Sequence, residues 1–316
     1  MAEKIYYLGV DGGGTKTTAV VFDGNGNFIC KACGESINYY SVGMDNARKA
    51  MADIISRLSV QEFSCAVIGM SALGERATEE ETERFCGGII KSNKIIMDSD
   101  LFVALEAMDA EGECAVVISG TGSMAVCRNS DKSISHAGGF GYILGDEGSG
   151  YSIAMSAIKT AIRAAEGCTE KTALTEKCLE FFSVRSVYDL IDLFYEKTVS
   201  RKTIASFAKE VMLCAQSGDK TALSIITEEA RLLSQTAMSL LKGKEKAIPV
   251  GLWGGVFQHN SLFKDAFSQF LADEGITDVK LLDFTPELGA IMACFRASDI
   301  KSLDIIRNTI KESYVL

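Results

Sequence analysis

The pattern of hydrophobic and polar residues predicts three short strands at the start of the chain. An apolar run from Ile5 leads into a glycine-rich turn, and two further runs, over 18–22 and 28–33, are separated by a second turn. Strands joined by such short turns pair with their sequence neighbours. We therefore expect an antiparallel meander here and no β-α-β unit.

The rest of the first half alternates between helical and strand patterns. Apolar residues at helical spacing predict a helix over 45–58, and the continuous apolar run Cys65–Met70 predicts a buried strand. A second helix over 78–86 and a strand over 94–97 follow. This half is therefore predicted to be a mixed α/β unit.

The second half begins on the same plan as the first. An apolar strand over 114–119 leads into a glycine turn, Gly-Thr-Gly-Ser over 120–123, and a strand over 124–128 comes next. A duplicated α/β unit would leave self-similarity of this kind in the sequence. We therefore expect two lobes of related topology.

Beyond this second turn the pattern is mainly helical. One helix has an apolar face of alanines and isoleucines and ends near Gly167. Further helical patterns follow over 185–197, 203–216 and 221–241. A buried strand over 250–253 returns to the sheet, and Thr285-Pro286 predicts a helix start, with threonine as its cap and proline in its first turn.

Composition indicates a folded protein with room for two lobes. The chain has 316 residues, of which 47% are hydrophobic and 23% are charged, which excludes a disordered chain. Its net charge of −10 would repel nucleic acid. A nucleotide would therefore be held by local loops and a metal ion, and we expect no nucleic-acid partner.

We expect a cytoplasmic protein without a membrane partner. The first residues lack the apolar core of a signal peptide, and no apolar stretch reaches the roughly 18 residues of a membrane span. The ten cysteines are scattered, which favours reduced thiols. Cys30 and Cys33 have the spacing of a redox or metal motif, but no second pair completes a zinc site, and strand alternation favours a structural role.

The segment Asp11-Gly-Gly-Gly-Thr-Lys-Thr has the composition of a phosphate-binding turn. Its glycines let the backbone approach a ligand and direct N–H groups toward one point, while the threonines add hydroxyl donors. It is neither a Walker motif nor a dinucleotide fingerprint, because a strand follows it instead of a helix. The alternative is a plain hairpin turn without a ligand. The aspartate at the end of the first strand argues against it.

The second turn, over 120–123, repeats this chemistry in the other half. Two such turns can hold the phosphates of one nucleotide from opposite sides, and phosphoryl transfer depends largely on positioning and charge stabilisation. Asp146 and Glu147 lie in the segment 138–150, which has six glycines among its thirteen residues. Acids before a helix can be simple caps, but so many glycines favour a ligand-facing loop.

Six segments, in this order, resemble those of a known superfamily. They are the first turn (11–17), Ser36-Ile-Asn38, Asp98-Ser-Asp100, the second turn (120–123), the segment 138–150 and Gly251-Leu-Trp-Gly-Gly255. Together they resemble the acetate and sugar kinases, heat-shock cognate chaperones and actin. Within that superfamily, the chain is similar to the N-acetylglucosamine kinase branch of the BadF/BadG/BcrA/BcrD ATPase family, over nearly its whole length.

The resemblance implies a fold and its boundaries. The fold would be α/β, with two ribonuclease-H-like lobes joined by a hinge and closing over ATP and sugar in the cleft between them. The N-terminal lobe would cover 1–112, the C-terminal lobe would cover 113–297 and be rich in helices, and a final helix near 298–312 would return the segment 298–316 to the first lobe. As partners we expect a small-molecule sugar and a second copy of the chain in a homodimer.

The resemblance also implies ligands for single residues. ATP and Mg²⁺ are the expected cofactors, with Asp11 anchoring the metal through water. The phosphates would be bound by Gly13, Gly14, Thr15, Lys16, Gly120, Thr121 and Gly122. The adenosine would be flanked by Gly254 and Gly255, with Ala215 as a further contact. The sugar would be bound by Asn38, Asp100, Gly139, Phe140, Gly141 and Asp146.

Asp98 and Asp100 both follow a predicted strand, and one of them would be the general base. The resemblance favours Asp100, through its spacing to the second turn and the Ala104-Leu105 pair on the following helix. This carboxylate would accept the proton of the sugar 6-hydroxyl as the oxygen attacks the γ-phosphorus. The alternative is that both aspartates only cap the helix.

The substrate is left open by one departure from the family pattern. Where the branch has Asn-x-Trp, this chain has Asn38-Tyr39-Tyr40, so that the aromatic wall beside the sugar differs, although Tyr40 can still stack on an apolar sugar face. We expect phosphorylation of an amino sugar at its 6-hydroxyl. N-acetylglucosamine is the first candidate, and its close relatives N-acetylmuramic acid and glucosamine are the others.

Two other functions are alternatives. An ATPase that activates a dehydratase would need cysteines for a [4Fe–4S] cluster at a subunit interface, whereas most cysteines here lie in apolar or strand contexts. A non-catalytic, sugar-responsive regulator would keep the same fold. The acids and both phosphate turns argue against it, and the sequence has no basic helix-turn-helix segment.

Overall fold

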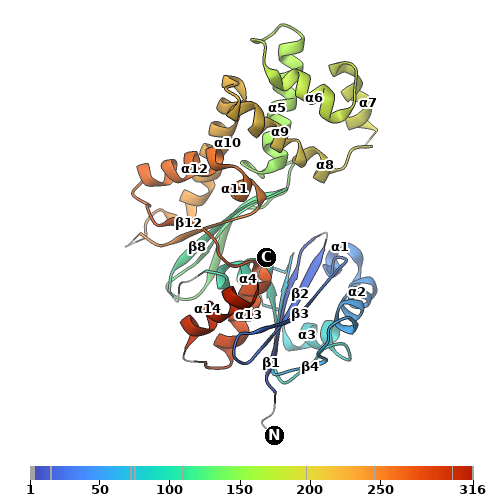
Figure 1. Ribbon diagram of the computed structural model, residues 1–316, viewed down its shortest axis with the longest axis vertical. Coiled ribbons are helices and arrows are strands. Elements are labelled where there is room, and N and C mark those ends of the chain that lie inside the picture. The colour runs from blue at the N-terminus through green and yellow to red at the C-terminus, as the bar shows by residue number, and fades with distance from the viewer. Residues whose placement is uncertain are drawn as a thin grey trace. The chain divides into compact units, whose positions relative to one another are not determined.

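The computed structural model describes residues 4–14, 16–71, 73–74, 76–108, 110, 112–196, 198–244, 247–300 and 302–314 (Figure 1). The chain forms two compact units. Unit 1 consists of Met1–Asp109 and Leu282–Leu316, and unit 2 is Ala110–Leu281. The α/β class, with its second unit rich in helices, is as predicted.

Unit 1 is built on a five-stranded sheet with the order β3-β2-β1-β5-β7. Its strands are β1 (Tyr6–Gly12), β2 (Thr17–Asp23), β3 (Phe28–Gly34), β5 (Cys65–Met70) and β7 (Ile95–Ser99). The first three form the predicted antiparallel meander, whereas β5 and β7 run parallel to β1. Two short strands, β4 (Glu62–Phe63) and β6 (Lys91–Ser92), form a separate small sheet.

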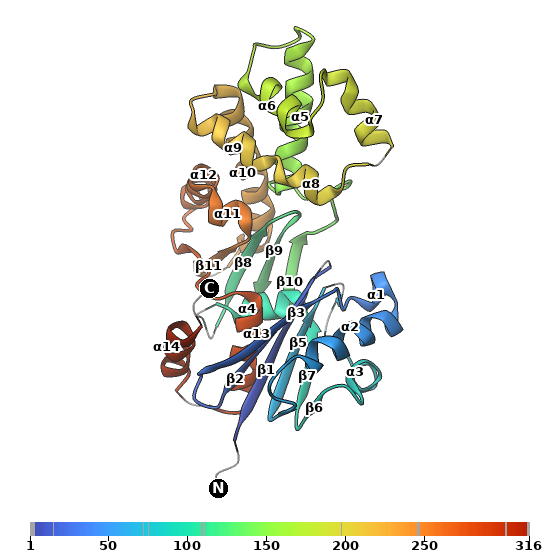
Figure 2. The ribbon, with the colours of Figure 1, turned by 45° about the vertical axis from the view of Figure 1, so that its right-hand side comes forward.

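Helices cover both faces of the five-stranded sheet of unit 1 (Figure 2). One face packs against α1 (Tyr39–Val42), α2 (Met44–Ser56) and α3 (Glu79–Cys86). The other face packs against α4 (Asp100–Glu106), α13 (Pro286–Ala297) and α14 (Leu303–Ser313). Alternate residues of β1 separate the two cores, since Leu8 and Val10 face the first layer and Tyr7 faces the second.

The chain returns to unit 1 at Leu282, earlier than the predicted residue 298. The reason is that α13, which is buried along nearly its whole length, packs on β1, β2, β5 and α4. Glycines allow this close approach: a methyl group at Gly289 would lie 1.9 Å from the Val103 carbonyl oxygen, and one at Gly9 would lie 2.6 Å from that of Glu287. The boundary near residue 112 falls at 109/110.

Unit 2 is built on a second five-stranded sheet with the order β10-β9-β8-β11-β12. Its strands are β8 (Cys114–Ser119), β9 (Ser123–Arg128), β10 (Ile134–Gly138), β11 (Val250–Trp253) and β12 (Val279–Leu281). Again three strands form an antiparallel meander, and the last two run parallel to the first. The two sheets therefore share one topology, as the repeated sequence plan predicts.

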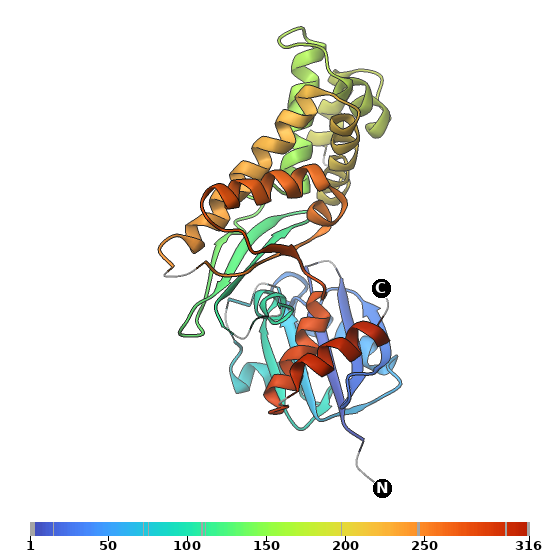
Figure 3. The same cartoon turned by 60° about the vertical axis from the view of Figure 1, so that its left-hand side comes forward.

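The helices of unit 2 share one hydrophobic core with its sheet. They are α5 (Gly150–Ala165), α6 (Ala173–Phe182), the 3₁₀ helix η1 (Val187–Asp189), α7 (Leu190–Tyr195), α8 (Arg201–Ser206), α9 (Ala208–Gln216), α10 (Lys220–Leu241), α11 (Gly255–His259) and α12 (Ser261–Asp273). The long helix α10 packs on β9 and β10, with α12 beside it (Figure 3). None of the helices in the described ranges is long and apolar enough to cross a membrane.

Two helices predicted as continuous are broken in the structure. The helix expected over 185–197 becomes η1 and α7, because Asp189 accepts hydrogen bonds from the N–H groups of Arg185 and Ser186 and fixes a tight first turn. The helix expected over 203–216 becomes α8 and α9 on either side of the buried Phe207. No elements were predicted where β10, α6, α12 and β12 lie.

All ten cysteines are free thiols. Cys30 packs against the α1–α3 layer of unit 1, whereas the exposed Cys33 lies beside Thr18, with 3.9 Å between its sulfur and the hydroxyl oxygen. Strand alternation therefore separates the two members of the Cys-x-x-Cys pair.

Candidate active site

The first glycine turn joins β1 to β2 in unit 1. Pairing of these strands ends at Gly12 and Thr17, so that the turn is formed by residues 13–16. Gly13, Gly14 and Lys16 are described, and Thr15 lies outside the described residues. A methyl group would find open space at Gly14, but at Gly12 it would lie 2.6 Å from the side chain of Ile37. The turn is therefore open at its tip and tightly packed at its base.

Hydrogen bonds fasten the segment 35–38 to this turn. The Ser36 hydroxyl donates to the Gly13 carbonyl at 3.0 Å, and the Thr17 hydroxyl donates to the Glu35 carbonyl at 2.7 Å. The predicted sugar segment and the predicted phosphate turn are thus held together within one unit.

Asn38 ends that segment and caps α1. Its Oδ1 accepts hydrogen bonds from the backbone N–H groups of Tyr40 and Ser41, and its Nδ2 donates to the Ser71 hydroxyl at 3.2 Å. Asn38 is only 7% exposed. These contacts leave one amide N–H of Asn38 for a ligand, while the neighbouring Tyr40 is exposed.

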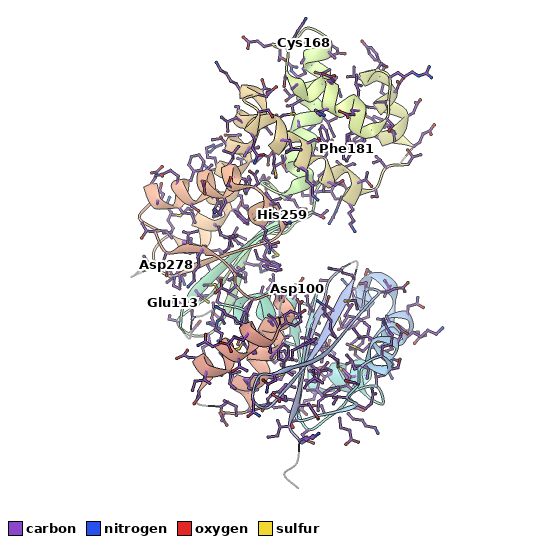
Figure 4. All side chains as sticks on the ribbon, in the orientation of Figure 1. Asp100, Glu113, Cys168, Phe181, His259 and Asp278 are labelled. Carbon is purple, nitrogen blue, oxygen red and sulfur yellow. The ribbon has the colours of Figure 1, made fainter. Side chains whose placement is uncertain are left out.

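Two carboxylates from other elements of unit 1 act on Asp11 near the end of β1. Asp11 belongs to β1, Asp100 begins α4 (Figure 4), and Glu287 lies in the first turn of α13. Burial raises the pKa of Asp11 to about 7, the charges of Glu287 and Asp100 add to the rise, and Lys16 opposes it. A cation placed beside Asp11 would favour its ionised form.

Asp98 and Asp100 lie in different environments, although one residue separates them. Asp98 is buried, forms an ion pair with Arg76 at 3.0 Å and accepts the N–H of Ser99 at 2.8 Å. Burial raises the pKa of the half-buried Asp100, and N–H groups at the start of α4 oppose the rise. Within the described ranges no lysine or arginine forms an ion pair with Asp100. Asp100 is therefore a half-buried carboxylate without a cationic partner in the described ranges, in contrast to Asp98.

Glu287 is a residue of this group that sequence reasoning missed. Its Oε1 lies 3.7 Å from the Lys31 ammonium and 3.4 Å from the Tyr314 hydroxyl, and Lys31 donates to that hydroxyl at 2.6 Å. The sequence predicted the start of this helix at Thr285. It did not predict that α13 returns to unit 1 and brings Glu287 to β1.

The acids of unit 1 suit a magnesium ion that is held through water and phosphate. In the part of the chain that the structure describes, no group of three or more acidic, histidine or cysteine side chains could hold a metal ion directly. Mg²⁺ usually keeps several waters and is bound by one or two carboxylates together with substrate phosphates. Asp11, at the base of an open glycine turn, fits this mode.

The second glycine turn joins β8 to β9 in unit 2. Strand pairing ends at Ser119 and Ser123, which leaves residues 120–122 to form the turn. The Ser119 hydroxyl donates to the Gly148 carbonyl and the Ser123 hydroxyl to the Glu147 carbonyl, both at 2.7 Å. These two hydrogen bonds fasten the turn to the glycine-rich segment 138–150.

Asp146 packs against this turn. A methyl group at Gly122 would lie 2.8 Å from Asp146 Oδ2, so only glycine admits the carboxylate there. Asp146 is 5% exposed and has a φ of 65°, a left-handed conformation that is unfavourable for most side chains. Burial raises its pKa, whereas a backbone hydrogen bond from Ser123 and the charge of Arg201 lower it. A buried acid packed against a glycine turn is therefore a candidate functional residue.

Glu229, in α10, fixes the loop that follows Asp146. It is buried and accepts hydrogen bonds from the Gly148 N–H at 2.7 Å, the Ser152 hydroxyl at 3.0 Å and the Ser156 hydroxyl at 2.7 Å. Because it accepts hydrogen bonds from all three donors, Glu229 links α10 to α5 and to the loop. Sequence reasoning missed Glu229 because it lies 81 residues from Gly148 and resembles any other acid of a helix.

The other predicted sugar-binding residues form an open loop after β10. Gly139 and Gly141 have φ values of 76° and 82°, and Phe140 between them is 72% exposed. Ile143 and Leu144 are exposed as well. This loop therefore presents apolar side chains that could cover a ligand.

Gly254 and Gly255 lie at the end of β11, which pairs with β8 as far as Trp253 and Ile118. Gly254 has a φ of 108°, and a methyl group there would overlap the Ser119 carbonyl oxygen at 2.2 Å. The predicted adenosine segment therefore touches the base of the second turn. Ala215 of α9 lies in the hydrophobic core of unit 2, so its side chain is not available to a ligand.

Comparison with known proteins gives the family. The BadF/BadG/BcrA/BcrD ATPase family model matches residues 8–294. The chain is 30% identical over 275 residues to an N-acetylmuramic acid/N-acetylglucosamine kinase of Clostridium acetobutylicum, which covers 84% of this chain and 90% of the relative. It is 28% identical over 315 residues to an N-acetyl-D-glucosamine kinase of Dictyostelium discoideum, with 92% and 97% covered.

A solved structure shows the same fold. The crystal structure of a candidate N-acetylglucosamine kinase from Porphyromonas gingivalis matches with a TM-score of 0.72 at 18% identity, over 94% of this chain and 100% of that one. The family model, the relatives and the paired turns on matching sheets agree. The chain belongs to the BadF/BadG/BcrA/BcrD ATPase family.

Proposed function

We propose that this protein is an ATP-dependent kinase of amino sugars. Its family is one of ATPases, and the two curated relatives described above are named for kinase activity on N-acetylated amino sugars. The paired glycine turns and the acids beside them supply the groups that phosphoryl transfer needs. We place the protein in the cytoplasm, which its free cysteines support.

In the proposed reaction the sugar 6-hydroxyl attacks the γ-phosphorus of ATP, and ADP leaves. Asp100 accepts the hydroxyl proton as the new O–P bond forms and the bond to ADP breaks. The observation that carries this assignment is the contrast between the two aspartates: Arg76 and Ser99 engage Asp98, whereas Asp100 is half-buried with a raised pKa and no cationic partner in the described ranges.

The remaining residues would bind and orient the two substrates. Backbone N–H groups of the two turns would hold the phosphates, with Lys16 adding positive charge and Gly254-Gly255 lying along the adenosine. Asn38, Asp146 and the loop 139–141 would orient the sugar. Asp11 would hold Mg²⁺, which when bound offsets the negative charge of the phosphates.

ADP release in a coupled assay tests this function. The acceptors are N-acetylglucosamine, N-acetylmuramic acid, glucosamine and glucose, each with Mg²⁺ and with EDTA as the control, and NMR locates the phosphate on the product. We expect magnesium-dependent turnover in which the best amino sugar exceeds glucose at least about tenfold in kcat/KM, and a 6-phosphate product. The proposal is wrong if no sugar raises ADP release above the rate without acceptor.

A further inference from the structure

Arg201, the first residue of α8, is held in a fixed place beside the loop 139–146. Its guanidinium carbon lies 5.4 Å from the centre of the Tyr142 ring, within the range of a cation–π contact. Tyr142 packs edge-on against Tyr151 of α5, with 4.9 Å between ring centres. The Tyr142 ring, which itself packs on Tyr151, therefore supports this exposed arginine.

The backbone also fixes the position of α8. A methyl group at Gly150, where α5 begins, would lie 3.1 Å from the Ala205 carbonyl oxygen of α8. The helix that carries Arg201 thus packs directly on the end of the glycine-rich segment 138–150. Arg201 is presented next to the proposed sugar-binding residues by packing, independently of the charge on its side chain.

The charge of Arg201 reaches Asp146 but is not neutralised. Burial raises the pKa of Asp146, and a backbone hydrogen bond from Ser123, followed by the charge of Arg201, opposes the rise. Over the described ranges, Arg201 forms neither an ion pair nor a hydrogen bond with another residue. A guanidinium has five N–H donors and matches a carboxylate with two parallel hydrogen bonds.

We propose that Arg201 binds an anionic group of the sugar, so that the preferred acceptor is an N-acetylated amino sugar that carries a carboxylate. This inference rests on the proposed kinase function and narrows its substrate. A neutral amino sugar offers Arg201 only hydroxyl groups, whereas a carboxylate gains charge-assisted hydrogen bonds. A nucleotide phosphate has the same anionic chemistry, and the experiment must separate the two sources.

N-acetylmuramic acid and N-acetylglucosamine are the matched probes, because they differ by one lactyl ether with its carboxylate. The variants are Arg201→Gln and, as control, Lys202→Gln, which removes the same charge from the adjacent exposed residue of α8. We expect wild-type protein to prefer N-acetylmuramic acid. Arg201→Gln should lower kcat/KM for that sugar about 10–100-fold, with N-acetylglucosamine and the KM for ATP within about twofold, and Lys202→Gln should change neither.

Three results would overturn the inference. An equal loss on both sugars would assign Arg201 to positioning Asp146, and a raised KM for ATP would assign it to a nucleotide phosphate. Turnover of N-acetylglucosamine without turnover of N-acetylmuramic acid by the wild type would exclude a carboxylate-bearing acceptor. A wild type inactive with every sugar would instead refute the proposed function. Circular dichroism and thermal unfolding check that each variant is folded, and Arg201→Lys should recover part of the preference.

Discussion

The two glycine turns occupy the same place in sheets of the same strand order, but they differ in chemistry. In unit 1 the last strand pair before the turn is Gly12–Thr17, and the residue before that pair is Asp11. In unit 2 the last pair is Ser119–Ser123, and the residue before it is Ile118. An acid of one turn is thus replaced by an apolar side chain in the other.

In unit 2 the acid beside the turn does not belong to the strands β8 and β9 that the turn joins. Asp146 comes from the segment after β10 and packs against Gly122, whereas the base of the unit 1 turn is closed by Ile37 against Gly12. The two units share a strand order and a glycine turn, whereas the acid beside each turn comes from a different part of its unit. Under the proposed function, unit 1 provides the metal-binding acid and unit 2 provides an acid for the sugar.

Among substitutions at the two turns, Asp11→Asn should lower the activity most. It removes the acid of the unit 1 turn that would hold Mg²⁺ beside the phosphates, so kcat/KM for ATP at saturating sugar should fall on the order of 100–1000-fold. The coupled ADP assay, run as a Mg²⁺ titration, measures the loss. Activity within about threefold of wild type would show that the two turns do not differ in this way.

The same variant should gain stability in a pH-dependent manner. Because the pKa of Asp11 is about 7 in the folded protein and 3.8 is its ordinary value, the unfolded chain releases its proton first, and the wild type loses stability as the pH rises between these values. Asp11→Asn removes this penalty. We expect it to be more stable by about 1–3 kcal/mol at pH 8 and nearly unchanged near pH 4. Urea unfolding measures both, and lower stability at pH 8 would contradict the raised pKa.

Gly122→Ala should have a smaller effect, which acts through Asp146. Its methyl group would meet Asp146 Oδ2 at 2.8 Å and displace the carboxylate, whereas nothing lies within 4 Å of a methyl group at Gly120. We expect the KM for the sugar to rise about tenfold in Gly122→Ala and to stay within about twofold in Gly120→Ala. Steady-state kinetics compare the two, and equal KM values would show that the contact with Asp146 has no part in sugar binding.

Local signals made most of the fold predictable. Short apolar runs separated by glycine turns predicted both meanders, because strands joined by two- to five-residue turns pair with their neighbours. The break between α8 and α9 at Phe207 was not predictable, since a buried aromatic residue continues a helical pattern equally well. The place where the chain returns to unit 1 also had no local signal, because the stretch Leu288–Phe295 of α13 is apolar and could pack in either lobe.

Some residues of the candidate site could be predicted from the sequence, and others could not. Asp11 and Asp146 stand out in the sequence because each is adjacent to glycines whose number exceeds what a turn or cap needs. Glu229, Glu287 and Arg201 do not, because each is a charged residue of an ordinary helix and becomes part of the site only through tertiary packing. The choice between Asp98 and Asp100 likewise depended on Arg76, whose pairing no sequence pattern indicates.

The rate of phosphoryl transfer in Asp100→Asn, measured beside Asp98→Asn, tests the central claim most directly. In a single turnover at saturating ATP, Mg²⁺ and sugar, Asp100→Asn should slow transfer about 100–10,000-fold because asparagine accepts no proton, and its stability should not fall. Asp98→Asn should lose about 1–3 kcal/mol of stability through its Arg76 contact but slow transfer less than about tenfold. A wild-type rate in Asp100→Asn, or a loss of transfer confined to Asp98→Asn, would contradict the account.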